Sequence, residues 1–271
     1  VGKIPPHRAA QTPEERAQEL VYRALEVEGR LRVKLAREAL RLWPDCADAW
    51  VVRAEEMPDP GRQVEFYRQA VAAGERALGP KPFAEDVGHF WGILQTRPYM
   101  RARNGLAGAL WATGQSDEAI THWQDLLRLN PGDNQGVRDI LVPRLIELRR
   151  DEEAEAVLTG YPEDRSAMLS YSRALVEYRR SGDGDAAQAT LEIAVRGNPH
   201  VIKYLTGGTA MPQFLPASYR LGSEDEAQLA AAALAPAWQA SENAVEWLRR
   251  SRRLRKKGIE ETRRRVKRRR R

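Results

Sequence analysis

The sequence predicts an all-α protein, a solenoid of antiparallel helical hairpins wound into a right-handed superhelix, with a basic C-terminal helix or tail. Prolines that follow predicted helices support this. Pro131 and Pro199 lie 68 residues apart, which corresponds to two repeat units of 34 residues each. Alanines that follow acidic or small residues recur at spacings of 35, 33 and 40, at Ala119, Ala154, Ala187 and Ala227. Apolar residues make up 42% of the chain and charged residues 30%, enough to bury a core.

The clearest repeat unit runs from Met100 to Asp133. Gly114 gives the backbone freedom that a short turn between two helices needs, and Pro131 closes the unit. Small residues stand where the two helices must approach, and larger ones fill the spaces beside them: Leu106, Ala107, Leu110, Ala119, Ile120, Trp123 and Leu126. This repeat length and this pattern of small and large apolar residues resemble the tetratricopeptide repeat, in which each unit is a pair of antiparallel helices.

Two further units follow, at about 135–167 and 168–201. In the first, Pro143 should kink or restart a helix, and Arg149 stands where the turn glycine is expected. Asp133 or Asn134 should cap the helix that begins this unit. Earlier pairs are expected at 15–48 and 47–78, and a last pair at about 213–235, before a capping helix from Pro236 to Leu248.

These units divide the chain into six segments. A flexible N-terminal arm is predicted at 1–14, degenerate hairpins at 15–78, and the three best units at 99–201. A C-terminal hairpin with its capping helix covers 202–248, and a basic tail covers 249–271. Residues 79–98 are an aromatic insertion, part of which should pack onto the array, and insertions in solenoids often carry recognition. Within it, His89 and Trp91 are candidate recognition residues, although a packed, hydrogen-bonded histidine is the commoner arrangement.

Three strings carry a closer resemblance: Gly88-His89-Phe90-Trp91, Thr96-Arg97-Pro98-Tyr99-Met100-Arg101-Ala102, and Asn130-Pro131-Gly132-Asp133-Asn134-Gln135-Gly136-Val137-Arg138. They resemble a group of bacterial tetratricopeptide proteins that is distantly similar to the eukaryotic family called suppressor of tumorigenicity seven. The resemblance covers roughly residues 20–248. It implies a helical solenoid and no particular chemistry.

The net charge of +6 is unevenly distributed. Residues 249–271 hold 15 Lys and Arg against two Glu, whereas the body before them has a net charge of −7. The tail therefore suits a polyanion: nucleic acid, the ribosome, an acidic protein face or an anionic membrane surface. Two alternatives are improved solubility and pairing with the acidic body. The candidate polyanion-binding residues are Arg263, Arg264, Arg265, Lys267 and Arg268.

The first helices of successive units should line a concave groove. Arginines and an amide there would suit a peptide with carboxylates, because a guanidinium binds a carboxylate through two hydrogen bonds. The full carboxylate clamp of chaperone-tail binders in the tetratricopeptide superfamily is missing. The alternative for each arginine is an ion pair with the acidic body. The groove residues predicted on these grounds are Arg97, Arg101, Asn104, Trp111, Arg138 and Arg179.

The sequence gives no sign of an enzyme. It contains no glycine-rich phosphate loop, paired-histidine metal motif or serine elbow, and Cys46 has no evident base partner, so we expect no catalytic residue, metal or cofactor. The chain does not begin with Met, and its start lacks the apolar run of a signal peptide. We therefore predict a cytoplasmic scaffold that binds a protein or peptide in its groove. The alternative is a nucleic-acid or ribosome adaptor that uses the arginine-rich tail.

Overall fold

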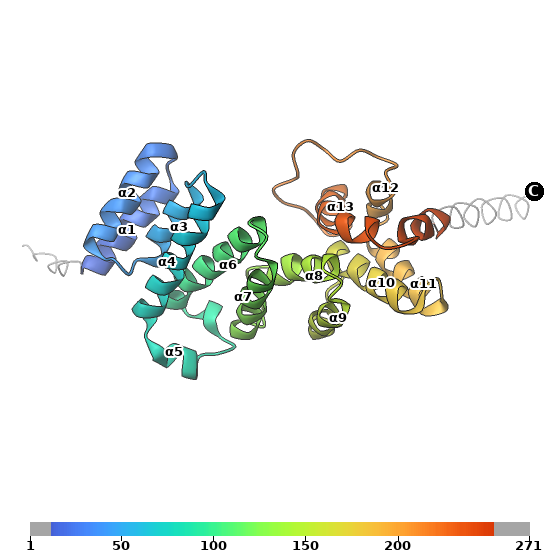
Figure 1. The fold of residues 1–271 in the computed structure, drawn as a ribbon, viewed down its shortest axis with the longest axis horizontal. Coiled ribbons are helices and arrows are strands. Elements are labelled where there is room, and N and C mark those ends of the chain that lie inside the picture. Colours follow the sequence, from blue (N-terminus) through green and yellow to red (C-terminus); the bar gives the residue numbers. More distant parts are fainter. Residues whose placement is uncertain (1–11, 252–271) are drawn as a thin grey trace, which may run out of the picture. The chain divides into compact units, whose positions relative to one another are not determined.

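The structure, a computed structural model, describes residues 12–251. These residues form helices, turns and loops without a β-strand, which confirms the all-α prediction. They fold as two compact units that divide after Val137 and are described separately here as unit 1 and unit 2. In both units consecutive helices fold back on one another as hairpins (Figure 1), the arrangement expected of tetratricopeptide-type repeats. A right-handed superhelix through both units stays a prediction.

Unit 1 consists of three hairpins and the insertion. The hairpins are α1 (Pro13–Leu25) with α2 (Gly29–Leu42), α3 (Ala47–Glu55) with α4 (Pro60–Leu78), and α6 (Arg97–Ala112) with α7 (Ser116–Leu129). The insertion forms α5 (Pro80–Glu85) and two 3-10 helices, η1 (Phe90–Gly92) and η2 (Leu94–Thr96).

Local sequence signals fix where these helices begin. Thr12 and Glu15 form a capping box at the start of α1, in which each side chain accepts a hydrogen bond from the other residue's backbone N–H. Asp59 accepts from the backbone N–H of Arg62, and Pro60 occupies the first position of α4, where a proline loses no intrahelical hydrogen bond. Thr12 and Asp59 therefore cap these two helices, and α1 begins two residues earlier than the predicted arm at 1–14 allows; residues 1–11 of that arm lie outside the described residues.

Small side chains let the first three helices pack closely. Their shared core consists of Ala17, Val21, Ala24, Leu35, Ala36, Ala39, Cys46, Ala49 and Val52, all buried. Burial raises the pKa of the Cys46 thiol to about 11, so this cysteine is a buried core residue, as expected. In the unit from Met100 to Asp133, the seven predicted core residues are buried and Gly114 has a φ of 79°, which confirms the predicted turn.

The insertion packs against α6 through its aromatic residues. Phe90 is fully buried, and the ring of Phe83 lies 5.3 Å from that of Phe90 and 5.2 Å from that of Tyr99 on α6, measured between centroids. The backbone N–H of Gly88 also donates to the carbonyl of Leu129 at the end of α7. Part of the insertion therefore packs onto the hairpins, as predicted.

Unit 2 contains two hairpins and a C-terminal cluster of helices. The hairpins are α8 (Val137–Glu147) with α9 (Asp151–Gly160) and α10 (Ala167–Ser181) with α11 (Asp185–Gly197). The short α12 (Val201–Leu205) and α13 (Glu224–Gln239) follow, joined by a long loop, and residues 244–251 are again helical.

Two features of the first hairpin in unit 2 refine the prediction. Helix α8 continues through Pro143, which excludes the restart, one of the two predicted alternatives; the kink stays a prediction. Arg149 has a φ of 62° and takes the left-handed conformation usually reserved for glycine at a helix end. The turn geometry of the repeat is therefore retained although the glycine is absent.

The predicted C-terminal helix from Pro236 to Leu248 was wrong in its boundaries. Pro236 lies inside α13, which ends at Gln239. A turn at 240–243 follows, in which Asn243 has a φ of 57°, and a new helix begins at 244. Trp247 stacks on Tyr178 with their ring centroids 4.5 Å apart, and the rings of Trp238 and Trp247 are also stacked, with centroids 6.1 Å apart. The cap is therefore a tryptophan cluster formed by two helices.

Candidate functional site

A hollow of about 570 Å³ lies in unit 1, among the first helices of its three hairpins. Its volume falls in the range of ordinary ligand pockets. We call it the unit 1 groove. Its lining comes from α1, the connection between α2 and α3, α3, the end of α4, the insertion and α6: Glu14, Glu15, Gln18, Tyr22, Trp43, Asp45, Ala47, Asp48, Gly74, Ala77, Leu78, Leu94, Gln95, Arg97, Pro98, Tyr99 and Arg101. Two predicted groove residues, Arg97 and Arg101, are thus brought together here.

Arg97 joins the insertion to the start of α6. Its Nε donates to the carbonyl of Trp91 at 2.9 Å, and its guanidinium lies 5.3 Å from the centroid of the Trp91 ring. The buried hydroxyl of Thr96 donates to the carbonyls of Ile93, at 2.8 Å, and Phe90. The two terminal nitrogens of Arg97 have no hydrogen-bond partner among the described residues, so they can donate to a ligand in the groove.

Arg101 forms a two-point ion pair with another lining residue of the groove. Its Nε and one terminal nitrogen donate to the Asp48 carboxylate at 2.9 and 2.6 Å. Asp48 is buried at the start of α3, whereas the side chain of Arg101 is 42% exposed. Arg101 therefore keeps one terminal nitrogen without a partner among the described residues, while Asp48 fixes the plane of the guanidinium.

Exposed apolar side chains form the rim of the groove. Tyr22 on α1 and Leu94 in η2 are 61% and 67% exposed, and Trp43 is half-buried between α2 and α3. Asp45 is paired with Arg76 at 2.7 Å, and Glu15 is engaged in the capping box. The carboxylates of Asp45, Asp48 and Glu15 are thus bound by the chain itself, and Glu14 remains as an exposed acidic residue at the rim.

Asn104 and Trp111 lie on α6 beyond the groove lining, and both contact Trp123. The side-chain oxygen of Asn104 accepts from Nε1 of Trp123 at 3.0 Å. The rings of Trp111 and Trp123 lie 6.1 Å apart. Because Trp123 is buried, these contacts hold α6 against α7.

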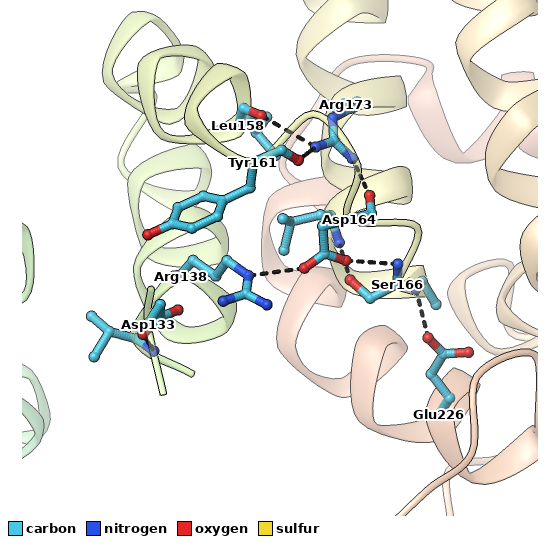
Figure 2. A network of polar contacts seen from close by, with 11 residues as sticks. Asp133, Arg138, Leu158, Tyr161, Asp164, Ser166, Arg173 and Glu226 are labelled. Carbon is cyan, nitrogen blue, oxygen red and sulfur yellow. Dashed lines mark hydrogen bonds and ion pairs between the residues drawn. The ribbon is translucent and has the colours of Figure 1, made fainter. Parts of the chain in front are cut away.

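Arg138 lies in a polar network of unit 2 (Figure 2). It donates from Nε to Asp164 at 2.8 Å, and its guanidinium lies 4.8 Å from the centroid of the Tyr161 ring. Burial opposes ionisation of Asp164, but hydrogen bonds from Ser166 and Arg138 outweigh it and lower the pKa of this carboxyl group. At the edge of the view, Asp133 accepts from the backbone N–H of Val137 at 2.7 Å, which confirms the predicted cap of α8.

Two residues of this network were not predicted from the sequence. Arg173 donates to three backbone carbonyls, of Leu158, Tyr161 and Asp164, and so closes the turn between α9 and α10. Glu226 is 3% exposed, and its carboxylate accepts from the backbone N–H groups of Ala167 and Gly222 and from the side chain of Asn198. The repeat period predicts neither, because Arg173 binds carbonyls 9 to 15 residues away and Glu226 joins Ala167 and Asn198, 59 and 28 residues away.

Arg179 is a buried structural residue. Its side chain is 8% exposed and donates to Asp151 at 2.6 Å, to the hydroxyl of Ser241 and to the carbonyls of Ile146 and Ala237. The alternative considered for each groove arginine, an ion pair within the chain, therefore describes Arg101, Arg138 and Arg179 in this structure.

The candidate recognition residues of the insertion differ from each other. His89 is exposed, so the expectation that it is packed was wrong, whereas Trp91 is half-buried beneath Arg97. The candidate residues of the basic tail, from Arg263 to Arg268, lie outside the described residues, and their polyanion binding stays a prediction.

Comparison with known proteins agrees with the resemblance in sequence. No family model matches the chain. The chain is 29% identical to the Suppressor of tumorigenicity 7 protein-like of Bos taurus over 197 residues, which is 64% of this chain and 36% of that protein. It is 28% identical to the Protein ST7 homolog of Caenorhabditis elegans over 217 residues, 66% of this chain and 40% of that protein. The predicted distant similarity to this family is thereby confirmed.

The chain spans about two fifths or less of the length of these relatives. Among solved structures, it matches the crystal structure of YrrB, described as a TPR protein with an unusual peptide-binding site. That match has a TM-score of 0.42 and 18% identity, and it covers 66% of this chain and 81% of YrrB. Among the described residues, no helix is both long and apolar enough to cross a bilayer.

Proposed function

We propose that this protein is a non-catalytic scaffold that binds a peptide segment of a partner protein in the unit 1 groove. The observation that carries the proposal is the groove itself, lined by the first helices of three successive hairpins and by the insertion. Hairpin repeats commonly use such a surface for binding. The groove combines apolar side chains with two arginines that keep terminal nitrogens without a partner among the described residues, which suits recognition by shape and a few polar contacts.

The lining indicates the chemistry of the peptide. Tyr22 on α1 and Leu94 in η2 both contribute exposed apolar surface to the lining, so an apolar or aromatic side chain is expected against them. Arg97 and Arg101 contribute the unpartnered terminal nitrogens, so a carboxylate is expected next to that side chain. We therefore propose a peptide in which an acidic residue adjoins an apolar one.

The contribution of the other predicted groove residues is structural in this proposal. Asn104 and Trp111 support Trp123, and Arg138 and Arg179 hold unit 2 together. A binding test that changes Asn104 would disturb the partner of a buried tryptophan. The test should instead use Leu94, whose exposed side chain lines the groove, and Arg97, with circular dichroism as a check that the insertion, which Arg97 also holds through Trp91, stays folded.

The experiment is selection of peptides from a random displayed library on the purified full chain. Peptides recovered should carry the acidic and apolar pair, and their affinity should fall about tenfold or more for Leu94→Ser and for Arg97→Gln. Leu31→Ser and Arg41→Gln are matched controls, since both residues are exposed on α2 outside the groove, and they should leave the affinity unchanged. Peptides without an acidic residue, or equal binding by all four variants, would refute the proposal.

A further inference from the structure

Unit 2 exposes a cluster of apolar side chains on the loop between α12 and α13. We call residues 206–222 the apolar loop. Phe214 is 81% exposed and Leu221 is 70% exposed, and three more large apolar residues of the loop are exposed: Met211, Leu215 and Tyr219. The loop contains no Asp or Glu and one basic residue, Arg220. Such a concentration of exposed apolar surface is uncommon without a binding partner.

The apolar loop is held at its two ends. Near its start, the backbone N–H of Thr209 donates to the carbonyl of Lys203 at 3.0 Å. At its end, the N–H of Gly222 donates to the buried carboxylate of Glu226 at 2.6 Å. Among the described residues, no backbone hydrogen bond involves 210–218, and Figure 1 shows this part of the loop standing clear of α12 and α13. Its apolar side chains are therefore presented on a fixed base.

Basic residues begin beside the start of this loop. The guanidinium of Arg249 donates to the carbonyl of Thr206, the first residue of the loop, at 3.2 Å. Arg250 follows and is exposed, paired with Asp183 at 3.2 Å. The sequence then continues into 252–271, which contains 13 Lys and Arg against two Glu. Arg249 thus lies beside the start of the apolar loop, and the sequence that follows Arg250, which we call the basic run, adds further positive charge.

We propose that unit 2 binds the surface of an anionic lipid bilayer, with the apolar loop in the headgroup region and the basic run on the anionic headgroups. Either feature alone gives weak attachment, and the two together are the usual requirement for stable peripheral binding. Single-stranded nucleic acid would also attract the basic run, and Phe214 and Tyr219 could stack on its bases. It offers no apolar medium for Met211, Leu215 and Leu221, so the composition of the loop favours lipid. This proposal is independent of the unit 1 groove.

The first test is sedimentation of the full chain with phosphatidylcholine vesicles, with and without phosphatidylserine. We expect binding only with phosphatidylserine, and a loss of about tenfold or more when Phe214→Gln and Leu215→Gln are combined. The matched control combines Leu31→Gln and Ile193→Gln, which remove two exposed apolar side chains from other surfaces. Arg263→Gln, Arg264→Gln and Arg265→Gln together should also weaken binding, because they remove charge from the basic run.

The second test reports insertion directly and uses the full chain. Phe214→Cys creates a thiol that can be labelled with an environment-sensitive fluorophore, whereas Cys46 is buried and should not react. Emission of the label should shift to shorter wavelength on phosphatidylserine vesicles, and a label on Ile193→Cys should show no shift. No emission shift at Phe214→Cys would overturn the proposal, as would equal sedimentation of the wild type and the loop variant. Tight polyuridine RNA binding that is weakened by the loop variant, with no sedimentation on vesicles, would overturn it in favour of nucleic acid.

Discussion

The ring of Tyr67 on α4 covers the backbone of Gly105 on α6. A Cβ atom at position 105 would lie 2.2 Å from Cε1 of that ring, closer than any ordinary contact. On the same pair of helices, a Cβ at Gly74 would lie 3.1 Å from the Cβ of Tyr99. Glycine therefore sets how closely the second hairpin of unit 1 approaches the third. Both α4 and α6 contribute residues to the lining of the groove.

Gly105→Ala should destabilise unit 1. Because Tyr67 is buried and cannot move freely aside, we expect a loss of about 1–3 kcal/mol in the free energy of unfolding, typical of an overpacked core. Gly108→Ala on the same helix is the matched control, since a Cβ there meets nothing within 4 Å. It should stabilise the helix by up to about 1 kcal/mol. Urea denaturation measures both, and similar midpoints for the two variants would contradict the close approach.

Arg179→Met should destabilise unit 2 without acting on the groove of unit 1. The substitution leaves Asp151 without its buried partner and removes the donors to Ile146 and Ala237, for an expected cost of about 3 kcal/mol. Arg250→Met removes an ion pair between exposed side chains in the same unit and should change stability little. Thermal unfolding followed by circular dichroism distinguishes them. A loss for Arg179→Met no larger than that for Arg250→Met would show that its contacts contribute little.

Glu226→Gln should destabilise the base of the apolar loop. The carboxylate accepts three hydrogen bonds through its two oxygens, whereas a glutamine has one oxygen and would direct its NH₂ group at a donor. We expect a loss of about 2 kcal/mol in stability, and faster hydrogen exchange at the N–H groups of Ala167 and Gly222. Asp225→Asn, a neighbouring exposed acid, is the control. Unchanged exchange at both amides would refute this role.

The stability of unit 1 should fall as the pH drops below about 6.5, because of His122. Burial lowers the pKa of His122, and Arg103 and Arg68 lower it further against the opposing effect of Glu118. Its Nδ1 accepts from Nε of Arg103 at 3.0 Å, so the folded chain favours the neutral imidazole. In the unfolded chain the imidazole takes up a proton near pH 6.5, and protonation therefore favours unfolding from there down to the lower pKa of the folded state.

Urea midpoints measured at about pH 7.5 and about pH 5.5 test this dependence. His122→Gln should reduce the difference between the two midpoints, whereas His89→Gln, at an exposed histidine, should leave it as in the wild type. If His122→Gln retained the full difference, another group would be responsible.

Much of the fold could be predicted because the core residues of a repeat protein recur at a regular spacing in the sequence. Ala107, Leu110, Ala119 and Trp123 recur at positions that a hairpin must bury, and all four are buried. The C-terminal cap was misjudged because Pro236 is tolerated inside α13, and the break at Asn243 depends on a left-handed residue that is not glycine. Local propensity does not identify such a break when tertiary packing of Trp238 and Trp247 decides it.

The candidate site could be predicted only in part. The spacing on α6 predicts that Arg97 and Arg101 share a face, and both line the unit 1 groove; that they bind a partner stays a prediction. The spacing did not reveal that Asp48 pairs with Arg101, or that Trp123 donates a hydrogen bond to the side-chain oxygen of Asn104. These partners come from other helices. Residues that share a face in sequence can therefore differ in whether their donors are available to a ligand.

The double engagement of Arg97 has a consequence for anyone who wishes to alter what this protein recognises. The same guanidinium secures the insertion through Trp91 and presents donors to the groove, so a change there affects architecture and chemistry at once. The side chains of Leu94 and Tyr22 are largely exposed, so substitutions there should alter the surface of the groove without disturbing the packing of the insertion. Redesign of the specificity should therefore begin with substitutions of Leu94 and Tyr22 and leave Arg97 unchanged.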